Sequence, residues 1–137
     1  MDEKDYKLSP EDRKLLAKDL YQRLGTKTLV QDMKYIKANR PIPIWLVDTI
    51  MEEVRLFADE PWIPIDTVRP YLRSLSSMTE EEKFELDRIV SIEHEGYLLV
   101  EEVPDIIDFY NQNHLDYRGL ITKGLALEAK EGMYEKE

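Results

Sequence analysis

The chain has 137 residues, of which 42% are hydrophobic and 35% are charged, and its formal net charge is −10. This length and composition are typical of a soluble globular protein with one core, so we expect residues 1–137 to form a single domain. General binding to nucleic acid is disfavoured, because that affinity comes from Lys and Arg residues that displace counterions. The sequence contains no cysteine, which excludes disulfides, thiolate metal sites and cysteine nucleophiles.

We expect a cytoplasmic protein that does not enter a membrane. Residues 1–5 lack the basic segment and the apolar stretch of a secretory signal. No apolar run approaches the roughly 20 residues that a membrane-spanning helix needs. The lack of cysteine is compatible with a reducing compartment.

The negative charge is concentrated in one segment. Residues 79–105 hold ten acidic residues against two basic ones, so this segment alone supplies −8 of the net charge. Most of it is typical of a solvated helix face, because acids in a first turn suit the helix dipole. The alternative is an anionic surface that docks on a basic partner or imitates nucleic acid. The candidate residues for that surface are Glu80, Glu81, Glu82, Glu85, Glu101 and Glu102.

A helix is predicted from about residue 10 to residue 24. Ser9 offers an N-cap hydroxyl, Pro10 suits the first helical position, and Gly25 can adopt the left-handed conformation that ends a helix. Between these signals leucines recur at nearly helical spacing. We interpret this leucine stripe as core packing.

Residues 26–58 fit two interpretations. As strands, residues 28–30, 35–36, 42–47 and 54–57 are extended and are separated by breaks rich in proline and polar residues. As a helix, residues 44–58 place apolar side chains on one face and polar side chains on the other. Periodicity alone favours the helix for this stretch.

The region from residue 62 to residue 78 is predicted to extend and then to turn. Residues 62–65 form a short extended run whose prolines suit the edge of a sheet. Pro70 disfavours helix at Arg69, so we expect residues 68–72 to make a tight turn that closes this strand. A connector rich in serine follows.

A second helix is predicted to start at Thr79. Glu82 stands three residues later and completes a capping box, and the helix should run to about Ile89 and bury Phe84. Residues 90–100 are typical of a hairpin that turns at a glycine.

A third helix is predicted over residues 103–113, where a proline stands near its start. A polar turn follows at residues 114–119. The short apolar pieces after it, residues 120–121 and 125–127, are expected to dock on the core. These elements predict an α+β fold with an N-terminal helix, a small bent antiparallel sheet, two further helices and a docked C-terminal tail.

Two stretches of sequence resemble a known family. They are residues 70–83, PYLRSLSSMTEEEK, and residues 107–134, which contain DYRGLI, GLALEA and EGMY. Both are similar to a family of small uncharacterised proteins encoded by gut Bacteroidales and their phages or prophages. Members of that family usually have proline where this chain has Ser74, Thr122 and Lys130, so these turns differ here.

The resemblance has consequences for the fold. It implies that the segment between the first helix and Tyr71 is mostly extended, which favours strands for residues 44–58. It also implies a small, strongly bent sheet that resembles an SH3-like barrel, with helices at either end. The family carries no established activity, so no functional residue is transferred from it.

Four side chains are candidates for contact with a partner protein, because Tyr and Arg often anchor interfaces. They are Tyr71, Arg73, Tyr117 and Arg118. The structural alternative is that Tyr71 packs beneath a turn and that Arg118 pairs with a nearby acid such as Asp116.

Catalytic and metal-binding patterns are not specific in this sequence. The two histidines, His94 and His114, lie in predicted turns without the spacing of a zinc motif, so we predict no metal and no cofactor. The serines lack a nucleophile motif, and carboxylates are too numerous for any one pair to be singled out.

We therefore expect a non-enzymatic accessory protein of a phage or mobile element that binds a host or phage protein. The first alternative is a small metal-dependent hydrolase built on carboxylates and a histidine. A weaker alternative is a nucleic-acid-binding module that uses the less acidic sheet.

Overall fold

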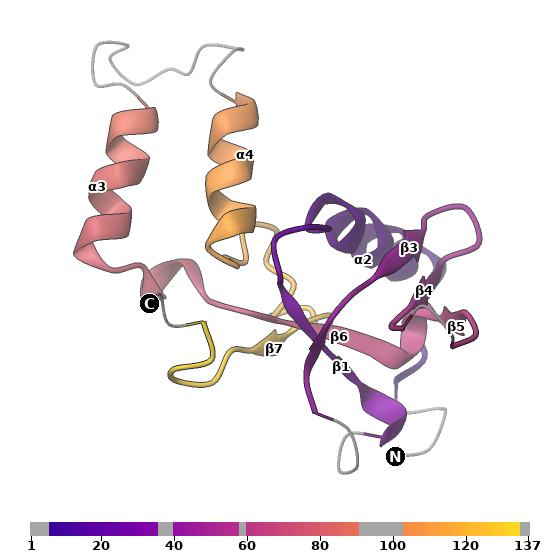
Figure 1. Ribbon diagram of the computed structural model, residues 1–137. Coiled ribbons are helices and arrows are strands. Elements are labelled where there is room, and N and C mark those ends of the chain that lie inside the picture. Colours follow the sequence, from indigo (N-terminus) through magenta and orange to yellow (C-terminus); the bar gives the residue numbers. More distant parts are fainter. Residues whose placement is uncertain (1–5, 36–39, 58–59, 91–102, 135–137) are drawn as a thin grey trace.

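The computed structural model describes residues 6–35, 40–57, 60–90 and 103–134 (Figure 1). The helices are α2 (Pro10–Gln22), α3 (Glu80–Ile89) and α4 (Val103–Gln112), and the short 3-10 helices are η1 (Met33–Tyr35), η2 (Ile65–Thr67) and η3 (Leu75–Ser77). The strands are β1 (Leu29–Asp32), β2 (Ile42–Pro43), β3 (Leu46–Asp48), β4 (Glu53–Arg55), β5 (Ile63–Pro64), β6 (Val68–Leu72) and β7 (Leu127–Glu128). The predicted α+β fold is confirmed.

The predicted N-terminal helix is confirmed as α2. The Ser9 hydroxyl oxygen accepts a hydrogen bond from the Asp12 backbone N–H at 3.2 Å, and Pro10 occupies the first turn. After the helix, Gly25 has a φ of +86°, which suits a residue without a side chain. The leucine stripe of α2 is buried against the sheets, as expected for core packing.

The strands form two small sheets. One has the order β2-β1-β6-β7 and the other has the order β3-β4-β5. All pairs are antiparallel except β6 with β7, where Tyr71 pairs with Leu127 in a parallel ladder. Within the described ranges, no strand of one sheet pairs with a strand of the other, so the two sheets do not close into one SH3-like barrel.

The strand interpretation of residues 44–58 is confirmed, because β3 and β4 pair in this stretch. The helix that periodicity favours is interrupted by the turn between the two strands. The carboxylate of Asp48 accepts hydrogen bonds from the backbone N–H groups of Ile50 and Met51 at 2.9 and 3.0 Å. Glu52 then takes a φ of +56°, a conformation that a helix cannot contain.

The tight turn predicted for residues 68–72 is wrong, because these residues form the fully buried strand β6. β6 lies between β1 and β7 in the larger sheet. The proline at position 70 specifies extended backbone at Arg69, and this conformation suits a strand as well as a turn. What places it in the middle of the sheet is pairing with segments distant in the sequence.

The apolar core lies between α2 and the sheets. Its fully buried members come from α2, β1, β4, η2, β6 and the tail: Leu16, Val30, Val54, Ile65, Val68, Leu72, Leu120 and Leu125. The burial of Leu120 and Leu125 confirms that the C-terminal tail docks on the core.

We call α2 with the two sheets the body, and α3 with α4 the helical arm. In Figure 1 the two helices of the arm run beside each other in opposite directions and stand away from the body. The predicted starts of both helices are confirmed, but Phe84 is 67% exposed, so its predicted burial is wrong. All but the first residue of the hairpin predicted at 90–100 lies outside the described residues. Among the described helices, none has the length and apolar character that a bilayer crossing requires.

Candidate functional site

Arg73 joins the body to α3. Its two terminal nitrogens donate to the two carboxylate oxygens of Glu82 at 2.7 and 2.6 Å, and they also donate to the carbonyls of Asn113 and Ser77. Glu82 accepts a further hydrogen bond from the Thr79 N–H, which completes the predicted capping box. The hydrogen bond that Arg73 donates to the Glu82 carboxylate raises the pKa of Arg73. This predicted partner-binding residue thus contacts the protein's own α3.

Arg118 takes part in a second polar cluster. It donates to the carboxylate of Asp19 on α2 at 2.6 Å, and Asp19 also pairs with Arg23 at 2.8 Å. Asp116, the partner suggested by sequence, instead accepts from the backbone N–H groups of residues 120 and 121. The guanidinium groups of Arg118 and Arg23 lie 4.5 and 5.2 Å from the ring centroid of Tyr117. Tyr117 and Arg118 therefore hold α2 against the chain that follows α4.

Tyr71 is buried in β6, and burial raises its pKa. Its hydroxyl lies 3.4 Å from the side-chain oxygen of Gln31 on β1. The four candidate contact residues thus lie in three places, in the sheet, at the start of α3 and beside α2. Their role in partner binding stays a prediction.

The acidic residues predicted on α3 differ in exposure. Glu80, Glu81 and Glu85 are exposed, whereas Glu82 is buried in its pair with Arg73. The other two candidates, Glu101 and Glu102, lie outside the described residues. The exposed members are compatible with a solvated helix face.

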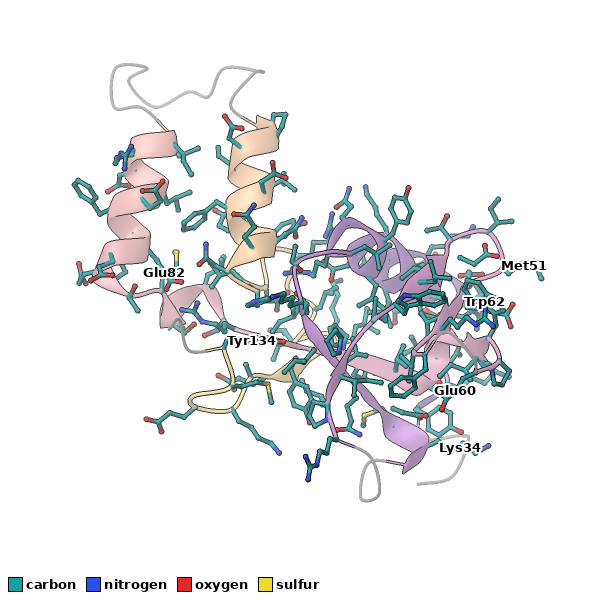
Figure 2. All side chains as sticks on the ribbon, viewed as in Figure 1. Lys34, Met51, Glu60, Trp62, Glu82 and Tyr134 are labelled. Carbon is teal, nitrogen blue, oxygen red and sulfur yellow. The ribbon has the colours of Figure 1, made fainter. Side chains whose placement is uncertain are left out.

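A groove of about 1010 Å³ lies between the start of α3 and the C-terminal tail. The two labelled residues Glu82 and Tyr134 mark its position in Figure 2. Most of the residues that line it are of polar or charged types, including five glutamates: Glu81, Glu82, Glu85, Glu128 and Glu131. In the parts of the chain that the structure describes, no three His, Asp or Glu side chains come together as metal ligands would.

His114 is half-buried and contacts Tyr134, one of the residues that line the groove. Its Nδ1 lies 2.8 Å from the hydroxyl of Thr28, and its ring stacks on Tyr134 with a centroid distance of 3.8 Å. The hydroxyl of Tyr134 donates to the Tyr71 carbonyl at 2.7 Å and accepts from the Leu29 N–H at 2.8 Å. These contacts fasten the tail to β1 and β6. The other histidine, His94, lies outside the described residues.

The sequence interpretation missed a surface on the smaller sheet. The structure exposes eight large apolar side chains among the described residues, and five of them flank β3, β4 and β5 or lie in the turn between β3 and β4. They are Trp45, Ile50, Met51, Phe57 and Trp62. In Figure 2, Met51 and Trp62 lie on this side of the molecule, away from Glu82 and the groove.

Arg55 stands at the centre of this surface. Val54, next to it on β4, is fully buried in the core, so strand alternation turns Arg55 to the opposite face. Val54 pairs with Ile63, and extending this register by one residue places Trp62 across from Arg55. The guanidinium carbon lies 5.8 Å from the ring centroid of Trp45 and 5.9 Å from that of Trp62. We call Trp45, Arg55, Phe57 and Trp62 the tryptophan face.

The rings of the tryptophan face are open to solvent, although the two tryptophans lie beside Arg55. Trp45 is 48% exposed, Phe57 is 46% exposed and Trp62 is 38% exposed. Beyond them, the turn between β3 and β4 presents Ile50 and Met51, held outward by the hydrogen bonds to Asp48. Exposed apolar side chains that gather around one small sheet in this way are typical of interaction sites on proteins.

A signal for this surface is visible in the sequence once the strands are known. Trp45 and Trp62 are the only tryptophans of the chain. Both flank short strands whose inward positions are already filled by Val47, Val54 and Ile63. Strand assignment was needed first, because the helical interpretation of residues 44–58 scatters these side chains over different faces.

We compared the chain with protein-family models, with curated proteins and with solved structures. None of these comparisons finds a significant match to this chain.

Proposed function

We propose that this protein is a non-enzymatic accessory protein that works by binding another protein, and that the tryptophan face is its contact surface. The observation that carries the proposal is the exposure of two tryptophans on either side of one arginine. Trp and Arg are the residue types that most often dominate the energy of protein interfaces. Large exposed rings also lose little conformational entropy on binding, because they have few rotatable bonds.

The surroundings of the face support this proposal. Arg55 belongs to the central strand of a three-stranded sheet whose inner side is part of the core, and the three rings flank these strands, so they are presented on a firm support. The interface side chains predicted from the sequence contact other parts of the chain, which leaves the tryptophan face as the better candidate. The resemblance to proteins of gut Bacteroidales and their phages supports a host or phage protein as the partner.

The test is a matched comparison of affinity capture from a bacterial lysate. The bait proteins are the wild type, the double variant Trp45→Ala with Trp62→Ala, and Tyr21→Ala, which removes an even more exposed ring from α2. We expect a stoichiometric partner on the wild type and on Tyr21→Ala, and its loss from the double variant. The captured protein is then purified and titrated against all three proteins.

Two results contradict the proposal. One is that no stoichiometric protein is captured by the wild type. The other is that the purified partner binds the double variant as tightly as it binds the wild type. Circular dichroism of the double variant serves as the folding control, since both rings lie outside the core.

A further inference from the structure

Arg55 holds hydrogen-bond donors that the fold does not use. Its Nε donates to the Glu60 carbonyl at 2.7 Å, which fixes the orientation of the guanidinium group. Within the described residues, its two terminal nitrogens make no hydrogen bond or ion pair. An arginine carries five N–H donors in a planar fork, so four of them remain for a ligand.

The carboxylates nearest in the sheet do not occupy this fork. Glu53 lies two residues before Arg55 on β4, and Asp48 lies across from Glu53 on β3. Asp48 is engaged by the N–H groups of its own turn, and Glu52 lies 3.9 Å from Arg13. Glu60 contributes its backbone carbonyl to Arg55.

The two tryptophan rings change what the fork can bind. Their centroids lie within 6 Å of the guanidinium carbon, and rings at this distance reduce the access of water to its charge, which strengthens an ion pair. A carboxylate is the natural complement, because two parallel N–H···O bonds match its two oxygens. Apolar side chains beside that carboxylate would cover the exposed rings of Trp45, Phe57 and Trp62.

We infer that the tryptophan face binds a partner segment in which an Asp or Glu side chain, or a C-terminal carboxylate, is flanked by apolar residues. This inference rests on the proposed function and names the chemistry that the face selects. The carboxylate pairs with the terminal nitrogens of Arg55, and the apolar neighbours pack on the two tryptophans. The charge of the carboxylate is compensated by Arg55 even though the chain as a whole is negative.

The experiment uses a displayed library of random 12-residue peptides selected on the full-length protein. Enriched peptides are synthesised in two forms, one with the natural acid and one in which Asp or Glu is replaced by its amide. Binding is followed by intrinsic tryptophan fluorescence, which reports on this face alone because both tryptophans of the chain belong to it.

We expect the enriched peptides to carry an acid between apolar residues. Replacing the acid by its amide should weaken binding by roughly 10- to 100-fold, as expected for hydrogen bonds to charged groups. Arg55→Gln should weaken binding of the acidic peptide by a similar factor and should leave the affinity for the amide form unchanged. Arg55→Lys keeps the charge but loses the fork, so it should restore only part of the affinity.

The outcomes separate this inference from the proposed function. Peptides that bind with changed tryptophan fluorescence but tolerate the amide, or tolerate Arg55→Gln, overturn the carboxylate specificity and leave protein binding at the face intact. Peptides that bind without any change in fluorescence, or the enrichment of no peptide, overturn the inference as well. If the capture experiment also finds no partner, the proposed function fails with it.

Discussion

The interactions that stabilise the body differ in kind from those that attach the helical arm to it. The body encloses a continuous apolar core from α2, both sheets and the tail. α3 buries a single side chain, Glu82, and that side chain is charged. The arm is joined to the body through two polar clusters, one around Arg73 and one around Asp19. Apolar burial therefore dominates the contacts of the body, whereas α3 is attached to it by an ion pair. α4 differs from α3, because it also buries Ile106 and Phe109.

This difference matters because buried ion pairs respond to mutation unlike apolar contacts. Removing one partner leaves the other charge buried without compensation, and the cost exceeds what the intact pair contributes. Buried ion pairs of this kind therefore contribute more to fixing the orientation of the arm than to the free energy of unfolding. Substitutions in the buried ion pairs, in exposed pairs and in apolar contacts should therefore differ in the size and the place of their effects.

Asp19→Ala is expected to have the largest effect on stability. It removes the carboxylate shared by Arg23 and Arg118, and Arg23 is only 2% exposed. We expect the free energy of unfolding to fall by about 3–5 kcal/mol, the usual cost of orphaning a buried charge. Urea unfolding followed by circular dichroism measures this loss. Lys18→Ala on the exposed side of α2 is the control, and a loss below about 1 kcal/mol for Asp19→Ala would contradict the prediction.

Arg73→Met should act mainly on α3. The carboxylate of Glu82 loses its two hydrogen bonds from the guanidinium group and keeps the one from the Thr79 N–H. We expect a loss of about 2–3 kcal/mol, because the pair is partly open to solvent. Hydrogen exchange should show faster opening of α3 while the amides of β1 and β6 keep their protection.

The control for that experiment lies on the same helix. Arg88 pairs with Glu85 at 3.1 Å, and the two side chains are 66% and 48% exposed. Arg88→Met should change stability by no more than about 0.5 kcal/mol, as is usual for exposed pairs. Equal effects of the two substitutions on exchange would show that Arg73 does not position the arm.

The contribution of Tyr134 to the stability of the contact between the tail and the sheet is expected to depend on pH in the alkaline range. Burial raises the pKa of its hydroxyl from 10.0 to about 12. Since the folded-state pKa is the higher one, its contribution is complete below pH 10 and is lost as the pH rises to about 12. A shift of this size corresponds to at most about 2–3 kcal/mol.

Urea unfolding of the wild type and Tyr134→Phe at several pH values tests this prediction. The wild type should be the more stable protein at pH 9, because the hydroxyl bonds to Tyr71 and Leu29. The difference should shrink between about pH 10 and pH 12. Tyr21→Phe, which alters an exposed ring, is the control. A difference that stays constant with pH would show that the hydroxyl titrates alike in both states.

Sequence alone predicted those features that depend on interactions between residues close together in the chain. The Ser9 cap and the Thr79–Glu82 capping box are of this kind, since each hydrogen bond joins residues three apart. The strand that contains Pro70 was harder to predict, because an extended backbone conformation does not specify the strand with which it pairs. β6 is completed by β7, which comes from the far end of the sequence.

The candidate site was less predictable than the fold. Tyr71, Arg73 and Arg118 have side chains suited to interfaces, but the same chemistry holds the body and the arm together. The tryptophan face depends on β3, β4 and β5 being strands, and periodicity alone pointed to a helix there. Exposure of a side chain follows from the whole arrangement, so it could not be assigned before the sheets were known.

Phe84→Ser is expected to have the smallest effect, and the reason lies in the capping box. The box and Arg73 fix Glu82 toward the body, and each helical residue adds about 100° of rotation. Phe84 therefore points about 200° away, toward solvent, whereas Leu86 and Ile89 return to the side of Glu82 and are half-buried. Phe84→Ser should change the free energy of unfolding by less than about 0.5 kcal/mol. The matched control is Phe109→Ala on α4, a buried ring whose loss should cost about 3–5 kcal/mol in the same urea titration. If Phe84→Ser instead destabilises the arm as strongly, the ring is covered in solution and the helix is rotated from the orientation that Glu82 sets.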